Sequence, residues 1–180
     1  MKIWFAALLL ASGLAHAADL ASADPALVKA QLRTLFLDAA REGRLAELST
    51  FIDAGYDLET RDENGYSALI LAAYHGHEQA VELLTEAGAD PCGQDRRGNT
   101  AMMGAIFKGN LAIAQRLLGA DCSPNQRNAA GQTPAMYAAL FQRKEILDAL
   151  AARGADLSLK DAAGNDVQQL MNGQFGSSPQ

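Results

Sequence analysis

A turn built around glycine returns along this chain at a fixed spacing of 33 residues. Each turn has a Gly, followed two positions later by a residue that can cap a helix: Gly65 with Ser67, Gly98 with Thr100, Gly131 with Thr133, and Gly164 with Asp166. A period of this length is typical of stacked helical repeats, in which every unit packs only against its neighbours. The spacing therefore predicts an elongated stack with one long recognition surface rather than a globule around one pocket.

The clearest unit starts at the turn before Ser67 and predicts two helices. The Ser67 hydroxyl is placed to cap a first helix built on the apolar run 68–73, and Gly76 ends that helix in the left-handed conformation. A second helix is expected over residues 78–86, with a buried stripe of apolar residues: Ala80, Val81, Leu83 and Leu84. Gly88 then stops this helix and turns the chain into the next unit.

The same frame divides the chain into four full units and a partial one. The predicted units cover residues 29–61, 62–94, 95–127 and 128–160, and a C-terminal cap covers residues 161–172. Residues 18–28 are expected to form an N-terminal lead and residues 173–180 a flexible tail. In the first unit, which lacks the glycine turn, Thr34 occupies the capping position.

These units resemble ankyrin repeats. The resemblance is carried by the turn with its Ser or Thr cap, the pair Ala72-Ala73, the dipeptide Gly76-His77, and Gly-Ala-Asp at residues 88–90 and 154–156. It covers roughly residues 29–173. It implies an all-α, ankyrin-like solenoid of stacked helix-turn-helix units joined by β-turn loops, and proteins of this family usually bind other proteins.

One unit departs from the pattern at the end of its second helix. Gly119-Ala120-Asp121 imitates the Gly-Ala-Asp element two residues early, whereas the 33-residue frame places Asp121 at the position of Gly88. Asp tolerates the left-handed conformation better than most residues. We therefore expect Asp121 to replace the glycine, with no deletion in this unit.

Residues 1–17 have the pattern of a secretory signal peptide. Lys2 gives a positive start, residues 3–14 are apolar or small, and Ala15-His16-Ala17 is a small-x-small cleavage site. The apolar run would extend about 18 Å as a helix, too short for a bilayer core of about 30 Å. We expect cleavage after Ala17 and export to the periplasm of a bacterium.

The expected mature chain is acidic. It keeps all 21 Asp and Glu and 14 of the 15 Lys and Arg, since only Lys2 is lost, which leaves a formal charge near −7. This balance opposes binding to nucleic acid and adsorption to an anionic membrane surface. We therefore predict a monomer that binds a protein partner, with no nucleic acid and no stable membrane insertion.

Cys92 and Cys122 are candidates for a disulfide. Export to an oxidising compartment and an even number of cysteines favour one bridge. Both residues lie in connections that leave a second helix, but equivalent positions in neighbouring units are about 10 Å apart, farther than a disulfide spans. The offset of the two cysteines in the frame makes a bridge feasible, and two free thiols are the alternative.

The sequence offers little for catalysis or for binding a metal. The mature chain has two histidines, His75 and His77, which with the distant cysteines make no recognisable zinc site. His77 occupies the Gly-His position, where a structural role at a helix end is expected. The glycines recur at turns rather than in a phosphate-binding loop. We predict no enzymatic activity, no metal and no cofactor.

Partner-binding residues are expected at the turn tips and at the end of each first helix, which line the concave face of ankyrin-like stacks. The predicted binding residues are Tyr66, Tyr74, His75, Arg96, Arg97, Asn99, Phe107, Lys108 and Phe141. Further cations expected there are Arg41, Arg61 and Arg127. Exposed aromatic and Arg side chains are typical of binding hot spots. Phe107 and Phe141 have two interpretations, because they either contact a partner or pack between helices.

These features predict an exported adaptor that binds an acidic protein surface with apolar pockets. The resemblance to small exported bacterial ankyrin-repeat proteins implies a role in stress, as support of catalases in peroxide defence. An immunity protein or inhibitor that neutralises a periplasmic toxin or enzyme is the alternative. An enzyme and a purely structural, self-associating protein are the remaining possibilities.

Overall fold

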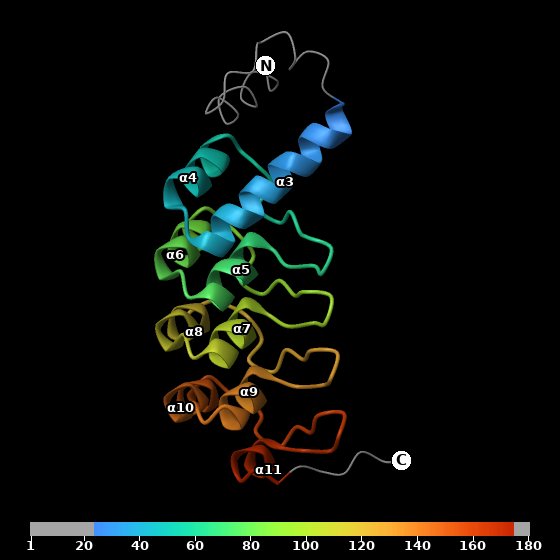
Figure 1. Cartoon of the computed structure of the whole chain (residues 1–180). Helices are drawn as coiled ribbons and strands as arrows, with labels where there is room; N and C mark the ends of the chain where they lie inside the picture. The colour runs from blue at the N-terminus through green and yellow to red at the C-terminus, as the bar shows by residue number, and fades with distance from the viewer. Residues whose placement is uncertain (1–23, 175–180) are drawn as a thin grey trace.

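The computed structural model describes residues 24–174, which fold into an elongated stack of helices (Figure 1). In chain order the helices are α3 (Pro25–Glu42), α4 (Leu45–Asp53), α5 (Ala68–His75), α6 (Glu78–Glu86), α7 (Ala101–Lys108), α8 (Leu111–Leu118), α9 (Pro134–Leu140), α10 (Lys144–Ala152) and α11 (Val167–Met171). The predicted signal peptide, residues 18–23 of the lead and residues 175–180 of the tail lie outside the described residues.

The helices form two layers along one axis. The first helices of the units (α3, α5, α7, α9 and α11) stack in one layer, and the second helices (α4, α6, α8 and α10) stack behind them (Figure 1). Long loops, which we call fingers, project beside the first layer and precede α5, α7, α9 and α11. Among the described residues the fingers contain only isolated β-bridges, Arg61 with Ser67 and Gln94 with Thr100. The predicted all-α solenoid is therefore confirmed.

Each finger tip is closed by one side chain at its start. In the second finger the Asp95 Oδ1 accepts hydrogen bonds from the N–H groups of Arg97 and Asn99, both at 2.8 Å. The other three fingers are closed in the same way by Asp62, Asn128 and Asp161. Asp and Asn suit this position because their short side chains bond backbone groups that follow them.

The residues predicted to cap the first helices that follow the fingers do so. Their side-chain oxygens accept from the N–H three residues later, at 3.4 Å for Ser67, 3.3 Å for Thr100, 3.3 Å for Thr133 and 2.9 Å for Asp166. Each bond satisfies one of the N–H groups that a helix leaves unpaired at its start. One residue of each finger therefore closes its tip, and another starts the helix that follows.

Neighbouring units interlock where the first helices end. Gly43 has a φ of 69°, and a Cβ added to it would lie 2.5 Å from Nδ1 of His77 in the next unit. The His77 Nε2–H donates to the Arg41 carbonyl at 2.9 Å. One unit later, the Asn110 Nδ2 donates to the Ala73 carbonyl at 3.0 Å. The residue before each of these second helices thus reaches back to the preceding first helix, and glycine leaves the room for it.

The first unit begins earlier than the repeat frame predicts. α3 starts at Pro25, and its N-cap is Asp24. Residues 25–28, which the frame assigns to the lead, are therefore helical. Thr34 is not a cap: it lies inside α3, where its hydroxyl donates to the Ala30 carbonyl at 3.1 Å. Asp followed by Pro is a strong start signal for a helix, and a frame built on the finger does not use it.

The expected left-handed conformation of Asp121 is wrong, whereas the candidate disulfide is present. Asp121 is not among the described residues with positive φ, although the equivalent residues after α4, α6 and α10 are: Gly55, Gly88 and Gly154. α8 ends at Leu118, one residue earlier in the frame than the other second helices. The residue after Asp121 is Cys122, which is bonded to Cys92, with their Cα atoms 5.5 Å apart. The chain therefore leaves α8 without a left-handed residue, and Cys122 is joined to the preceding unit by the bridge.

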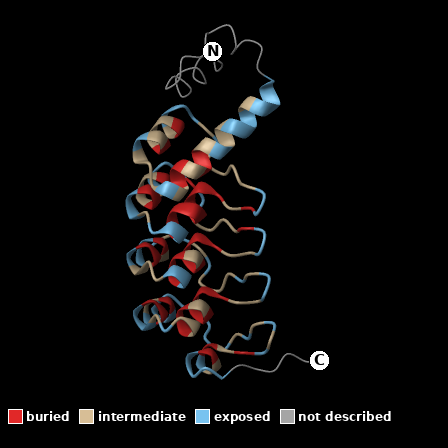
Figure 2. Cartoon of the chain, in the orientation of Figure 1, coloured by how far each residue is buried: buried red, intermediate tan, exposed pale blue. Residues whose placement is uncertain are grey.

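The core runs along the whole stack (Figure 2). Residues 68–73 of α5 are all buried, whereas α6 buries only one side of the helix, with Ala80, Val81 and Leu84. The first helices α5, α7 and α9 are enclosed because each packs against a first helix on either side and against the second helix of its own unit. Side chains available to a partner are therefore found mainly at the C-terminal ends of the first helices, at the finger tips and on the outer sides of the second helices.

Candidate functional site

Most of the predicted binding residues gather on one surface, which we call the inner face. It consists of the C-terminal ends of α5, α7 and α9 together with the tip of the second finger, and its residues are Tyr74, His75, Phe107, Lys108, Phe141, Arg96 and Arg97. All of them are exposed except Phe141, which is half-buried. The inner face lies at the finger tips and the ends of first helices, where the sequence predicts partner-binding residues.

A row of aromatic rings runs across three units on the inner face. Tyr74 and Phe107 lie nearly parallel, with ring centroids 6.1 Å apart, and Phe107 meets Phe141 edge to face at 5.0 Å. Tyr137 continues the row, 5.9 Å from Phe141. Tyr74 is 37% exposed and Phe107 44% exposed. The rings therefore support one another and still present apolar surface to solvent.

The repeat explains why these rings meet. Tyr74 and Phe107 occupy one position in successive units, so their spacing follows from the stacking of α5 on α7. In the fourth unit that position holds Leu140, and the ring comes from Phe141 at the C-cap of α9. Of the two interpretations of the phenylalanines, Phe107 is on the surface, whereas Phe141 is partly packed between Phe107 and Tyr137.

Positive charge accompanies the aromatic row. The Lys108 Nζ lies 5.1 Å from the centroid of the Tyr74 ring, a cation–π contact between adjacent units. The rings of His75 and Tyr74 lie edge to face with centroids 5.3 Å apart, and the ring of His75 is nearly parallel to that of His77, with centroids 6.4 Å apart. Burial lowers the pKa of His75, and the nearby His77, Arg41 and Lys108 lower it further. His75 thus sits among cations on a basic part of the surface.

Arg96 and Arg97 form the tip of the second finger. The Arg96 N–H donates to the Asn64 carbonyl at 3.0 Å, and the Arg97 carbonyl accepts from the Ala129 N–H at 2.8 Å. These backbone bonds tie each finger tip to the next. Within residues 24–174 neither guanidinium group forms an ion pair or a side-chain hydrogen bond. Both charges are therefore available to a partner, and hydrogen bonds to the neighbouring finger tips fix the backbone that carries them.

Two of the predicted binding residues have structural roles instead. The Asn99 Oδ1 accepts from the Tyr137 hydroxyl at 3.0 Å and from the Asn128 Nδ2 at 2.9 Å. Tyr66 is half-buried against the core. Tyr137, which was not predicted as a site residue from the sequence, links this polar network to the aromatic row. Its spacing of four residues from Phe141 on a helix was the available signal.

Three further cations expected on this surface are also engaged. Arg61 donates to the carbonyls of Gly65 (3.1 Å) and Gln94. Arg127 donates to the Lys160 carbonyl, and Arg41 pairs with Asp38. These contacts hold successive fingers together or stabilise α3. The cations left for a partner on the inner face are accordingly Arg96, Arg97 and Lys108, with His75 when it is protonated.

Other kinds of site find little support in the described part of the chain. Residues 24–174 contain no group of three or more His, Cys, Asp or Glu side chains that could hold a metal ion. No helix of this part combines the length and the apolar character needed to cross a membrane. The hollow of largest volume described, about 460 Å³, is an open groove between α4 and α6, lined by Leu45 and Leu83 among others. It lies in the second layer, and neither His75 nor His77 lines it.

Comparison with known families identifies the repeats. The family described as ankyrin repeats (3 copies) matches residues 8–95, 35–128 and 92–161, which together cover most of the sequence. A search of curated proteins found no match to this chain. Ankyrin repeats generally serve as protein–protein interaction modules. The chain therefore belongs to the ankyrin-repeat family.

Proposed function

We propose that this protein is an exported, non-enzymatic adaptor that works as a monomer and binds a protein partner through the inner face. The observation that carries the proposal is the aromatic row Tyr74–Phe107–Phe141 with Lys108 beside it. Aromatic and Arg side chains on a rigid surface contribute large shares of binding energy at protein interfaces. The row is already ordered by contacts between its rings, so little side-chain entropy is lost on binding.

The chemistry of the inner face indicates the partner surface it fits. Lys108, Arg96 and Arg97 are exposed cations on an otherwise acidic chain, so the partner should present carboxylates opposite them. The exposed parts of Tyr74 and Phe107 require an apolar patch between those carboxylates. Such binding should weaken as salt screens the charges.

The proposed site of action is the periplasm. The support is the signal-peptide pattern of residues 1–17 and a disulfide that suits an oxidising compartment, and we expect cleavage after Ala17. Expression of the full chain, followed by fractionation and N-terminal sequencing, tests this part. Recovery from the cytoplasm with an intact N-terminus would overturn it.

Affinity capture from a periplasmic fraction, followed by mass spectrometry, would identify the partner. The test of the inner face is the triple variant Tyr74→Ala/Arg96→Ala/Arg97→Ala, which should bind the purified partner at least about 10-fold more weakly. The matched control, Lys144→Ala/Arg153→Ala/Leu157→Ala, removes the same charge and an equally exposed apolar side chain from outside the inner face. Unchanged affinity of the first variant, with helical circular dichroism intact, would contradict the assignment.

The proposed biological role is support of a peroxide-degrading enzyme such as a catalase. Its support is the resemblance to small exported bacterial ankyrin-repeat proteins. Deletion of the gene should raise sensitivity to hydrogen peroxide and lower catalase activity, and the inner-face variant should fail to restore either. Normal survival in peroxide would reject this role without affecting the test of binding. Protection against a periplasmic toxin would instead identify an immunity protein.

A further inference from the structure

The second helices of the first, second and fourth units end in the same way. The residue after the left-handed glycine donates its N–H to the carbonyl five residues earlier: Tyr56 to Phe51 at 3.0 Å, Ala89 to Leu84 at 2.9 Å, and Ala155 to Leu150 at 3.0 Å. Such a bond satisfies a carbonyl at the helix end and fixes the direction in which the chain leaves.

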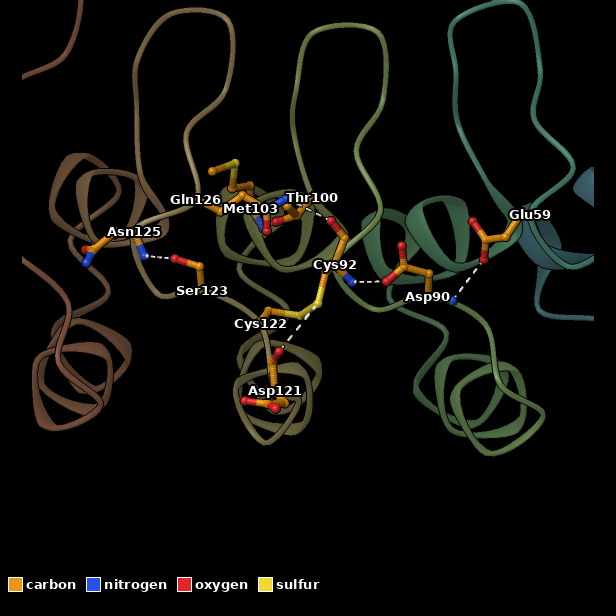
Figure 3. The surroundings of a disulfide bond; sticks show 10 residues. All are labelled: Glu59, Asp90, Cys92, Thr100, Met103, Asp121, Cys122, Ser123, Asn125 and Gln126. Atoms are coloured by element: carbon orange, nitrogen blue, oxygen red, sulfur yellow. Dashed lines mark hydrogen bonds between the residues drawn. A yellow bond between two sulfur atoms is a disulfide. The ribbon is translucent and has the colours of Figure 1, made fainter.

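The third unit lacks this closure. Cys122 occupies the closing position, and within the described residues its N–H makes no such bond. At the end of α8 the backbone hydrogen bonds join residues only three positions apart, and the last of them runs from the Ala120 N–H to the Leu117 carbonyl at 3.1 Å. The Cys122 side chain is instead bonded to Cys92, in the connection that leaves the preceding unit (Figure 3). In the third unit a disulfide between side chains therefore holds the residue that a backbone hydrogen bond holds in the other units.

Hydrogen bonds farther along also hold this connection: the Asn125 Oδ1 accepts from the Asp156 N–H at 2.8 Å, and the Asn125 N–H donates to the Ser123 Oγ at 3.3 Å. The Gln126 Nε2 donates to the Cys92 carbonyl at 2.8 Å. Beside Cys122 lies a hollow of about 240 Å³ that reaches Met102 of α7, Pro134 of α9 and Leu150 of α10. The connection thus adjoins apolar side chains of three helices without filling the space between them.

We propose that the Cys92–Cys122 disulfide is a redox-sensitive lock on the third and fourth units, which replaces the glycine closure of the other units. A dithiol reductant opens it: one reductant thiolate attacks one sulfur and forms a mixed disulfide, and the other protein sulfur leaves as a thiolate. The second reductant thiolate then attacks the reductant sulfur of the mixed disulfide, which releases the remaining protein sulfur as a thiolate and closes the disulfide of the reductant. Two electrons and two protons pass to the protein, which gains two thiols. Neither a covalent bond nor a backbone closure then holds the end of α8.

Reduction also affects the inner face, a consequence that rests on the proposed function. α7 carries Phe107 and the C-cap of α9 carries Phe141, and the connection released by reduction joins α8 to the finger before α9. Loosening it relaxes the contact between these rings, and the partner then binds more weakly. The structural tests below need no partner, so failure of the lock and failure of the proposed function can be told apart.

The first test compares the chain from Ala18 onward in its oxidised form, in its reduced form, and as Cys92→Ser/Cys122→Ser. The oxidised form should melt roughly 10 °C higher than the other two. Hydrogen exchange should rise on reduction in residues 111–141, while α5 and α6 stay protected. An equal rise in all units, or no rise, would overturn the proposal.

The second test restores the missing glycine. In the Cys92→Ser/Cys122→Ser protein, Asp121→Gly should recover several degrees of the lost melting temperature, because it allows the backbone closure to form. In the oxidised protein the same substitution should recover nothing, since the lock already closes the helix. Ala120→Gly, one position away, is the matched control and should recover nothing in either protein. Equal shifts of Asp121→Gly in both proteins would show that the disulfide acts only as a cross-link.

Discussion

The side chain of Gln142 donates a hydrogen bond from Nε2 to the backbone carbonyl of Met171, 3.0 Å away and 29 residues later. The same nitrogen donates to the Ala139 carbonyl at 3.2 Å. Gln142 has a φ of 55°, the left-handed conformation that glycine adopts at the ends of α5 and α7. This conformation costs a residue with a side chain about 1 kcal/mol. The two hydrogen bonds offset that cost and tie α11 to the fourth unit.

Substitutions at Gln142 should separate the two effects. Gln142→Ala removes the hydrogen bonds and keeps the strained backbone, so the free energy of unfolding should fall by about 1 kcal/mol. Gln142→Gly also removes the bonds but relieves the strain, so it should be less destabilising by several tenths of a kcal/mol or more. Urea denaturation measures both values. Equal losses would show that the left-handed backbone has no cost here.

Gly43 should tolerate substitution less well than Gly88. Both have positive φ, but a Cβ on Gly43 would lie 2.5 Å from His77 Nδ1, whereas a Cβ on Gly88 would have no atom within 4 Å. Gly88→Ala should therefore cost about 1 kcal/mol from backbone strain, and Gly43→Ala about 3 kcal/mol from strain and crowding. Denaturant titration gives both losses. Adding His77→Ala to Gly43→Ala should return part of the difference in a double-mutant cycle.

The hydroxyl of Tyr137 should matter both for stability and for its response to alkali. Tyr137→Phe removes the bond to Asn99 and should lower the free energy of unfolding by about 1 kcal/mol at neutral pH. Burial raises the pKa of Tyr137 above its unfolded value near 10. The contribution of the neutral phenol to the free energy of unfolding is therefore fully present below pH 10, and it is lost as pH rises through the folded pKa. Urea titrations at pH 8 and above pH 10 should show a shallower loss for Tyr137→Phe than for the wild type.

His75 should make the protein less stable in mild acid. Its pKa is lowered, mainly by burial, so the unfolded chain, with a histidine pKa near 6.5, takes up the proton more readily. The contribution of the neutral His75 ring to the free energy of unfolding is therefore fully present above pH 6.5 and is lost as pH falls through the folded pKa. The loss should be small, because the side chain is only partly shielded from solvent. His75→Gln should flatten the dependence between pH 7 and pH 5, while the control Arg96→Gln leaves it unchanged. An NMR titration with a His75 pKa of 6.5 or higher would contradict this prediction.

Features determined by neighbouring residues were predictable from the sequence. The second helix expected over residues 78–86 is α6, the Ser67 cap forms, and Gly76 is left-handed with a φ of 84°. Each of these features depends on residues only a few positions apart, and the period repeats them in every unit. The family could be recognised on the same basis.

The inner face was only partly predictable. The sequence placed Tyr74, Phe107 and Lys108 at the ends of first helices, where they are exposed. It did not distinguish Arg96, which is available to a partner, from Arg61, whose guanidinium bonds a carbonyl of the next finger. Whether a long side chain is available depends on what the adjacent unit presents to it, and that is a tertiary contact.

The period, the two helices of each unit, their caps and most of their glycine turns are encoded locally, because they follow from hydrogen bonding and backbone conformation within a few residues. How adjacent units meet depends on the stacking of the folded chain. This stacking brought Phe107 against Phe141, engaged Asn99 with Tyr137, and replaced the expected left-handed Asp121 by a bridge from Cys122 to Cys92. Each of these contacts joins residues about 30 or more positions apart, and their distances are set by the stacking of one unit on the next.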